Sequence, residues 1–224
     1  DLTNGISPLE MAAAYATIAN DGVYIEPTFY TKVEDVNGQV VLEPKQKTEK
    51  VMSPQNAYIA KSLLTAPVVG PSGTAKYCAI PGMDVAAKTG TTDESKDRWL
   101  CGFTPYYAAA CWYGYDTPEE VTGYGYNNPA GMIWDAVMTD LHKGLAGATF
   151  VRPSGVVDAT VCRLTGCIPN SGCTDVYKEI FTSDNMPQKC EGHGAQLICS
   201  ESGKLATEFC EQYVPVKSSS IGEI

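Results

Sequence analysis

Cysteine is distributed unevenly along this chain, and the asymmetry constrains the fold more than any other feature of the sequence. Three of the nine cysteines precede residue 150 and six follow it. A short, weakly apolar segment dense in cysteine is typical of a small disulfide-stapled unit outside the cytoplasm, whereas a cytosolic chain can use the same spacing to bind zinc. We therefore predict two parts: a domain over residues 1–149 and a cysteine-rich tail over residues 150–224.

The tail contains an internal repeat. Each copy has an apolar residue, a cysteine, two variable residues, a serine or threonine and a glycine, and its second cysteine lies eleven positions after the first: Cys162 and Cys173, then Cys199 and Cys210. This spacing predicts two similar loops closed by Cys162–Cys173 and Cys199–Cys210 disulfides, and Cys167 and Cys190 are candidates for a third. Zinc is the alternative, because clustered thiolates also bind metal, but the tail has no CxxC pair and both histidines lie outside the repeat.

The first part has the pattern of an α+β domain rather than of alternating βαβ units. Helices are predicted where a capping residue precedes a proline and an apolar face follows, after Ser7, Ser53 and Asn128. Strands are predicted at 29–36 and 39–42, around a two-residue Asn37-Gly38 turn, and at 99–103 and 107–113, around Thr104-Pro105. The charged stretch 43–50 is expected to be a solvated connection. Together these elements predict an antiparallel sheet with packed helices.

The candidate site is the stretch Lys88-Thr89-Gly90-Thr91-Thr92, which ends a short apolar run with the pattern of a strand. An ammonium there can hold a proton network together, threonine hydroxyls can bind a carboxylate, and the glycine lets a substrate backbone approach. The backbone N–H of Thr91 can serve an oxyanion hole. We therefore predict Lys88 and Thr91 as catalytic, and Thr89, Gly90 and Thr91 as substrate-binding. Taken alone, three such residues also fit an ordinary solvated strand end.

The overall charge excludes one class of partner. Acidic residues exceed basic ones by 26 to 16, giving a net charge of -10, which argues against binding to a nucleic-acid backbone.

No apolar run approaches the length of a membrane span. The sequence starts at Asp1 without a methionine or a secretory leader, so we expect a processed chain or a piece of a longer one.

Four stretches together resemble one protein family. They are GISPLEMAAAYATIANDG at 5–22, residues 27–41 with the Asn-Gly turn, GMDVAAKTGTT at 82–92, and DRWLCGFTPYYAAACWYGYD at 97–116. The chain resembles the transpeptidase domain of the penicillin-binding proteins, especially the bifunctional class A enzymes, and CSESGKLATEFC at 199–210 resembles their C-terminal tails. The resemblance implies a partial penicillin-binding/β-lactamase-like fold and a serine D,D-transpeptidase that cross-links peptidoglycan stem peptides and is inhibited by β-lactam antibiotics. It implies no cofactor and a place on the cell-wall side of the plasma membrane, with an anchor upstream.

That family builds its site from SxxK, SxN and KTG motifs, in this order. Only the third is matched here, by Lys88, because no serine of the chain has a lysine three residues later. Ser183-Asp184-Asn185 spells the second motif but follows Lys88, and we interpret it as coincidence. The chain alone is therefore expected to be inactive. It is also expected to be marginally stable or to self-associate, because the missing helices would leave apolar surface exposed. A non-catalytic extracellular module that binds the cell wall through its cysteine-rich repeats is the alternative.

Several residues near the candidate stretch are interpreted as structural. The segment Ser72-Gly73-Thr74-Ala75 resembles a small loop that precedes the KTG strand in the family. Trp99 and Trp112 fit best as core aromatics of the sheet. Lys96 and Arg98 are near enough to reach the mouth of the site, but charges beside a turn are usually only solvated.

Overall fold

The computed structural model describes residues 5–125, 127–191, 197–201 and 212–215. The chain divides into two compact units, Asp1–Ser154 and Gly155–Ile224, which are described separately below. The first unit is an α+β domain with an antiparallel sheet, as the sequence predicts.

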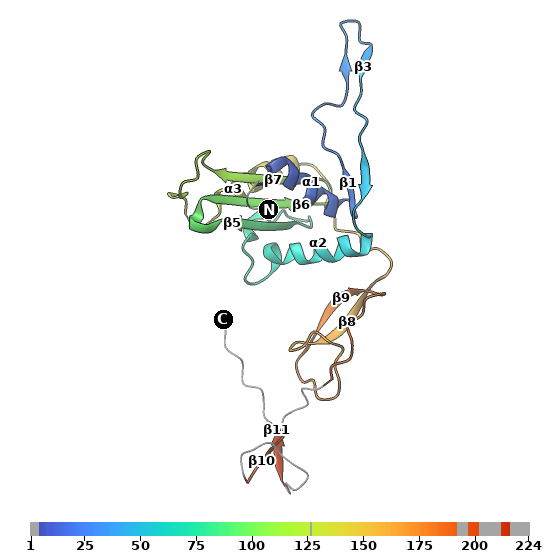
Figure 1. Ribbon diagram of the computed structural model, residues 1–224, viewed down its shortest axis with the longest axis vertical. Helices are drawn as coiled ribbons and strands as arrows, with labels where there is room; N and C mark the ends of the chain where they lie inside the picture. Colours follow the sequence, from blue (N-terminus) through green and yellow to red (C-terminus); the bar gives the residue numbers. More distant parts are fainter. Residues whose placement is uncertain (1–4, 126, 192–196, 202–211, 216–224) are drawn as a thin grey trace. The chain divides into compact units, whose positions relative to one another are not determined.

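The centre of the first unit is a three-stranded antiparallel sheet in the order β5-β6-β7 (Figure 1). Its strands are β5 (Ala86–Thr91), β6 (Asp97–Phe103) and β7 (Ala108–Gly114). In the register Thr91 faces Arg98 and Lys88 faces Cys101, while Leu100 of β6 faces Cys111 of β7. The predicted hairpin around Thr104-Pro105 is therefore confirmed.

Three capped helices cover this sheet: α1 (Pro8–Ala19), α2 (Pro54–Val69) and α3 (Pro129–Leu141). Each begins at the predicted cap, and at α1 the Ser7 side chain and Glu10 form a reciprocal capping box. Helix α1 packs on one face, where Tyr15 meets Phe103 edge to face at 6.3 Å, and α3 lies on the other (Figure 1). The core between the sheet, α2 and α3 consists of buried residues from these elements and from the connection between α2 and β5: Val68, Ala75, Cys78, Val85, Ala87, Leu100, Ala130, Trp134 and Met138.

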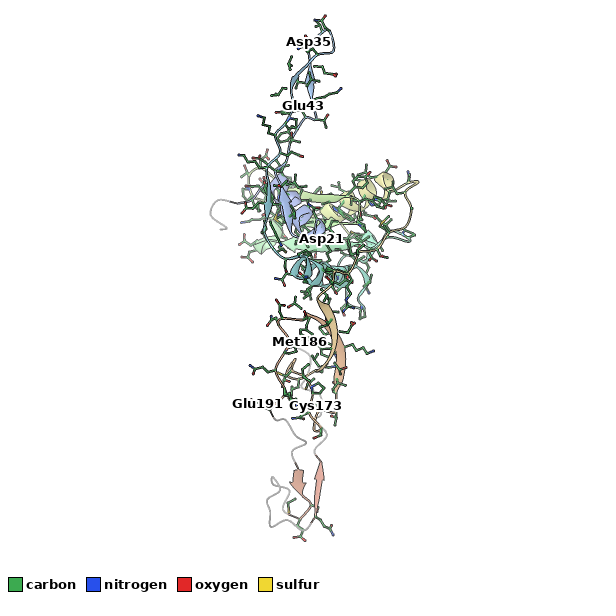
Figure 2. All side chains as sticks on the ribbon, turned by 90° about the vertical axis from the view of Figure 1, so that its right-hand side faces the viewer. Asp21, Asp35, Glu43, Cys173, Met186 and Glu191 are labelled. Atoms are coloured by element: carbon green, nitrogen blue, oxygen red, sulfur yellow. The ribbon has the colours of Figure 1, made fainter. Side chains whose placement is uncertain are left out.

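The N-terminal strands differ from the prediction in two places. The stretch 43–50 is not wholly a connection, because β4 (Thr48–Lys50) pairs with β1 (Val23–Ile25) and so satisfies its backbone groups. The hairpin of β2 (Val33–Glu34) and β3 (Val40–Leu42) has shorter strands and a wider loop than predicted. Asp35 lies at its tip (Figure 2), where its carboxylate accepts the N–H groups of Asn37 at 2.8 Å and Gln39 at 2.9 Å, and Gly38 adopts φ 80°. The turn is therefore set by Asp35 as well as by Asn37-Gly38.

The second unit contains two hairpins of the same design. Strands β8 (Val156–Cys162) and β9 (Val176–Thr182) pair antiparallel, as do β10 (Leu197–Cys199) and β11 (Tyr213–Pro215). In the first hairpin Cys162 faces Val176, and in the second Cys199 faces Tyr213. Each facing residue lies three positions after the second cysteine of its repeat. The internal repeat seen in the sequence is therefore also a repeat of strand register.

Candidate functional site

Strand β5 separates the predicted site residues onto two faces of the sheet. Side chains of successive strand residues point to opposite faces, so Thr89 and Thr91 share one face and Lys88 shares the other with Gly90. The two threonines line a groove, whereas Lys88 does not, and its exposed ammonium donates to the Thr89 carbonyl oxygen at 2.9 Å. The structure thus brings the two hydroxyls together and leaves the lysine outside their groove.

The Arg98 guanidinium lies in the same groove as the two threonines. Arg98 faces Thr91 across the β5–β6 pair, and its Nη1 donates to the Thr91 hydroxyl oxygen at 2.9 Å. Its guanidinium stacks on the Tyr124 ring at 4.7 Å, and its Nε is buried without a hydrogen-bond partner among the described residues. Sequence reasoning took Arg98 for a solvated charge. The signal that was missed is the pairing of the two strands. In an antiparallel hairpin, the residue directly opposite Thr91 has its side chain on the same face of the sheet.

The groove has a volume of about 400 Å³. Its far wall comes from the loop before β5, the short 3₁₀ helix η1 (Lys76–Cys78) and the start of α3: Gly73, Thr74, Lys76, Tyr77, Asn127 and Asn128. The Thr74 hydroxyl lies 3.0 Å from that of Thr89, so the loop at 72–75 contributes directly to the groove. Burial raises the pKa of Tyr77 to about 12, which keeps this phenol neutral.

The backbone of β5 offers hydrogen-bond donors on its open side. The Thr92 N–H donates to the Asp97 carbonyl oxygen at 3.2 Å and therefore points toward β6. N–H groups of successive residues in an antiparallel strand alternate in direction, so the Thr91 N–H points away from β6. Within the described residues β5 pairs only with β6, which leaves the Thr91 N–H on an unpaired edge.

The turn after β5 carries an exposed ion pair. The 3₁₀ helix η2 (Asp93–Ser95) precedes Lys96, whose ammonium lies 2.5 Å from the Glu94 carboxylate. Their hydrogen bond lowers the pKa of Glu94 and raises the pKa of Lys96. Lys96 does not line the groove, so for this residue the interpretation as a surface charge fits its position.

The burial of the tryptophans differs from the prediction. Trp99 and Trp112 are only half-buried, and the Trp112 indole donates to the Asp97 carboxylate at 2.7 Å. The buried indole belongs to Trp134 on α3, which is 2 % exposed and donates to the Ala109 carbonyl oxygen. The sequence marked α3 by its Asn128-Pro129 cap and did not single out this residue.

The tail residues singled out from the sequence lie in the second unit. Ser183-Asp184-Asn185 forms an exposed turn after β9. The sulfur atoms of Cys162, Cys173 and Cys190 lie within 4.8 Å of one another, whereas the Cys167 thiol lies 3.7 Å from the Thr165 carbonyl oxygen and is not in that group. The Cys162–Cys173 disulfide stays a prediction, and so does Cys199–Cys210, because Cys210 lies outside the described residues.

Comparison with known proteins identifies both parts of the chain. The family model "Penicillin binding protein transpeptidase domain" matches residues 4–138, and "Penicillin-binding protein 1A, C-terminal domain" matches residues 152–194. Penicillin-binding protein 1A of Clostridium botulinum is 38% identical over 96% of this chain and 26% of its own length. Penicillin-binding protein 2D of Bacillus subtilis is 31% identical over 83% of this chain and 27% of its own. The chain thus spans about a quarter of the curated relatives it matches.

Solved structures agree with the sequence matches. Penicillin-binding protein 1A of Haemophilus influenzae superposes with a TM-score of 0.69 over 82% of this chain and 33% of its own, at 24% identity, and so shows the fold. PonA1 of Mycobacterium tuberculosis has a TM-score of 0.57 at 31% identity, covering 66% of this chain and 41% of its own. Within the described residues, no helix is long and apolar enough to cross a bilayer. This chain belongs to the penicillin-binding protein transpeptidase family.

Proposed function

We propose that the groove beside β5 holds the terminal carboxylate of a peptidoglycan stem peptide during D,D-transpeptidation. The observation that carries the proposal is the hydroxyl pair of Thr89 and Thr91 with the Arg98 guanidinium beside it. Arg98 can only donate hydrogen bonds, so its contact with the Thr91 oxygen leaves the Thr91 hydroxyl hydrogen available to the groove. Two hydroxyl donors and a cation match a carboxylate in both hydrogen bonding and charge.

The same strand supplies a second element of acyl transfer. A serine hydroxyl that attacks the D-Ala-D-Ala carbonyl places negative charge on its oxygen, and the unpaired Thr91 N–H is suited to stabilise that charge. The C-terminal D-alanine then leaves with a proton, and a neighbouring stem peptide's amine takes the acyl group to form the cross-link. In this proposal the nucleophilic serine and its base come from residues other than these 224, and β-lactams acylate the same serine. The site then works on the cell-wall side of the plasma membrane.

Lys88 has a separate role in this proposal. Because its side chain lies on the opposite face from Thr89, it is placed to contact the nucleophile's hydrogen-bond network rather than the carboxylate in the groove. Its ammonium donates one of its three N–H groups to the Thr89 carbonyl oxygen, which leaves two for an acceptor from the proton relay.

The test is covalent labelling by fluorescent penicillin. The 224-residue chain should remain unlabelled, and the longer enzyme that contains it together with an SxxK serine should be labelled stoichiometrically. In the longer enzyme, Thr91→Val should slow acylation by about 10- to 100-fold, the loss expected for one hydrogen bond to a charged group. Thr92→Val is the matched control, because the Thr92 hydroxyl donates to Asp97 and does not line the groove.

Three outcomes would contradict the proposal. Stoichiometric labelling of the 224-residue chain would mean that it contains its own nucleophile. Equal acylation rates for Thr91→Val and Thr92→Val would mean that the groove does not hold the carboxylate. If the longer enzyme instead sediments with insoluble peptidoglycan but is never acylated, the non-catalytic wall-binding function is correct.

A further inference from the structure

We propose that Cys162, Cys173 and Cys190 form a three-thiolate site for a soft divalent metal ion, with Zn²⁺ as the ion that fits best. The site lies in the second unit and is independent of the transpeptidase groove. Cys162 ends β8, Cys173 lies in the loop that leads to β9 (Figure 2), and Cys190 follows β9. Thiolate ligands select soft ions, and zinc accepts three protein ligands with a further position for solvent.

The distances between the sulfur atoms suit one ion. All three lie within 4.8 Å of one another. Tetrahedral zinc with bonds of about 2.3 Å to sulfur separates its ligands by roughly 3.8 Å, so the side chains need to close by only about an ångström. Cys162 is 1% exposed and Cys190 is 5% exposed, whereas Cys173 is partly exposed and leaves a side open to solvent.

The backbone holds these cysteines in place without an ion. The Cys162 N–H donates to the Cys167 carbonyl oxygen and the Cys190 N–H donates to the Ile168 carbonyl oxygen, both at 2.8 Å. The Asn170 side-chain amide donates to the Cys190 carbonyl oxygen, also at 2.8 Å. A loop that links all three cysteines in this way presents its ligands at little entropic cost on binding.

Two hydrogen-bond donors point at sulfur atoms of the cluster. The Asn170 backbone N–H points to the Cys173 sulfur and the Thr165 hydroxyl to the Cys190 sulfur, each at 3.4 Å. Such donors orient metal-bound thiolates and offset part of their charge. The Cys173 thiol itself lies 3.3 Å from the Asn170 side-chain oxygen, and its proton, like those of the other two thiols, is released when the ion binds.

A disulfide accounts for this arrangement less completely. It would join two of the sulfur atoms and leave the third beside the bond it could attack, so the pairing would exchange readily. A metal ion uses all three sulfurs in a single arrangement. The grouping also places Cys190 with Cys162 and Cys173, whereas the sequence offered Cys167 as its disulfide partner.

Cobalt is the probe for the test. The 224-residue chain, with Cys199→Ser and Cys210→Ser to silence the second repeat, is titrated with Co²⁺ under a non-thiol reductant. One equivalent should give the thiolate-to-cobalt charge-transfer absorption of three sulfur ligands, and one equivalent of Zn²⁺ should displace it. Cys162→Ser, Cys173→Ser and Cys190→Ser should each weaken binding at least tenfold, while Cys167→Ser serves as the matched control and should not.

A second variant tests the hydrogen bond to sulfur. Thr165→Val should weaken Zn²⁺ binding by roughly 10- to 100-fold and Thr165→Ser should restore it, with circular dichroism confirming that each variant is folded. Three results would overturn the proposal: no charge-transfer band in the reduced chain, loss of the band in Cys167→Ser, or an undiminished band in Cys190→Ser. If the band is absent and the air-oxidised chain carries a Cys162–Cys173 bond by peptide mapping, the loop is a disulfide loop.

Discussion

The buried hydroxyl of Thr104 should stabilise the first unit through hydrogen bonding alone, and Thr104→Val tests this. Thr104 begins the turn between β6 and β7 and is 1% exposed. Its oxygen accepts the N–H groups of Tyr106 at 3.1 Å and Tyr107 at 3.2 Å, and it lies 2.8 Å from Nε2 of the buried His142. His142 Nδ1 lies 2.6 Å from the Met138 carbonyl oxygen, which only accepts, so Nδ1 carries the proton and Nε2 accepts from Thr104.

Valine has nearly the shape of threonine, so the substitution removes these hydrogen bonds without opening a cavity. A buried group left without a partner costs about 1–3 kcal/mol. Nε2 should carry the full cost, because His142 is 6% exposed, whereas the turn N–H groups lie beside exposed tyrosine side chains and recover part of theirs from water. We therefore expect the free energy of unfolding to fall by about 2–4 kcal/mol, a large share of the stability of a typical domain.

The measurement is urea unfolding of the 224-residue chain followed by circular dichroism. Thr104→Ser is the control, because it keeps the hydroxyl and removes one methyl group, at a cost of about 1 kcal/mol. If Thr104→Val lowered the free energy of unfolding no more than Thr104→Ser does, the network would contribute nothing beyond packing, and the reasoning would be refuted.

Four further predictions concern packing, pH, the groove and association. Gly131→Ala should lower the free energy of unfolding by about 1–3 kcal/mol in urea melts, because the added Cβ would lie 2.1 Å from the Tyr77 hydroxyl oxygen. Burial raises the pKa of the Cys78 thiol from 9.0 to about 12 and that of the Cys101 thiol from 9.0 to about 11. Above about pH 9 the folded chain therefore keeps protons that the unfolded chain loses, and the melting temperature should fall as the pH rises. A melting temperature that stays constant up to about pH 11 would contradict this. Arg98→Met should slow penicillin acylation of the longer enzyme by about tenfold or more, and Lys96→Met, outside the groove, should not. On size-exclusion chromatography the 224-residue chain should self-associate, because Met132, Ile133, Val137 and Leu141 of α3 are all about half exposed; a clean monomer would argue against this.

Much of the fold was predictable because its signals are local. The caps at Ser7, Ser53 and Asn128 act within one helical turn, and the structure places a helix after each one. The strand β4 was missed because Thr48, Glu49 and Lys50 are all exposed, so no apolar pattern marks them. Their pairing with β1 rests on backbone hydrogen bonds, which leave little trace in side-chain type.

The sequence predicted the continuous stretch 88–92 but not the other residues that line the groove beside it. Its motif is continuous in sequence, so the prediction named Thr89 and Thr91, and both line the groove. The groove depends on which residues share a face, and that follows from the strand register, which the sequence did not specify in advance. Arg98 belongs to the groove because it faces Thr91, and Thr74 belongs because its loop folds back onto Thr89. The cysteines show the same limit: their spacing suggested pairs, while the fold groups three sulfurs.

The matching registers of the two tail hairpins determine how an insertion or deletion in the tail would affect its strands. Cys162 and Cys199 each end a strand, and each faces a residue that lies the same number of positions later in the sequence. The strand register of each hairpin is therefore set within its own copy of the repeat. A copy inserted or deleted whole leaves the pairing of its neighbour intact, whereas an insertion of one residue inside a copy would turn every later side chain of that strand to the other face. The register of each hairpin therefore depends on the spacing within its own copy of the repeat.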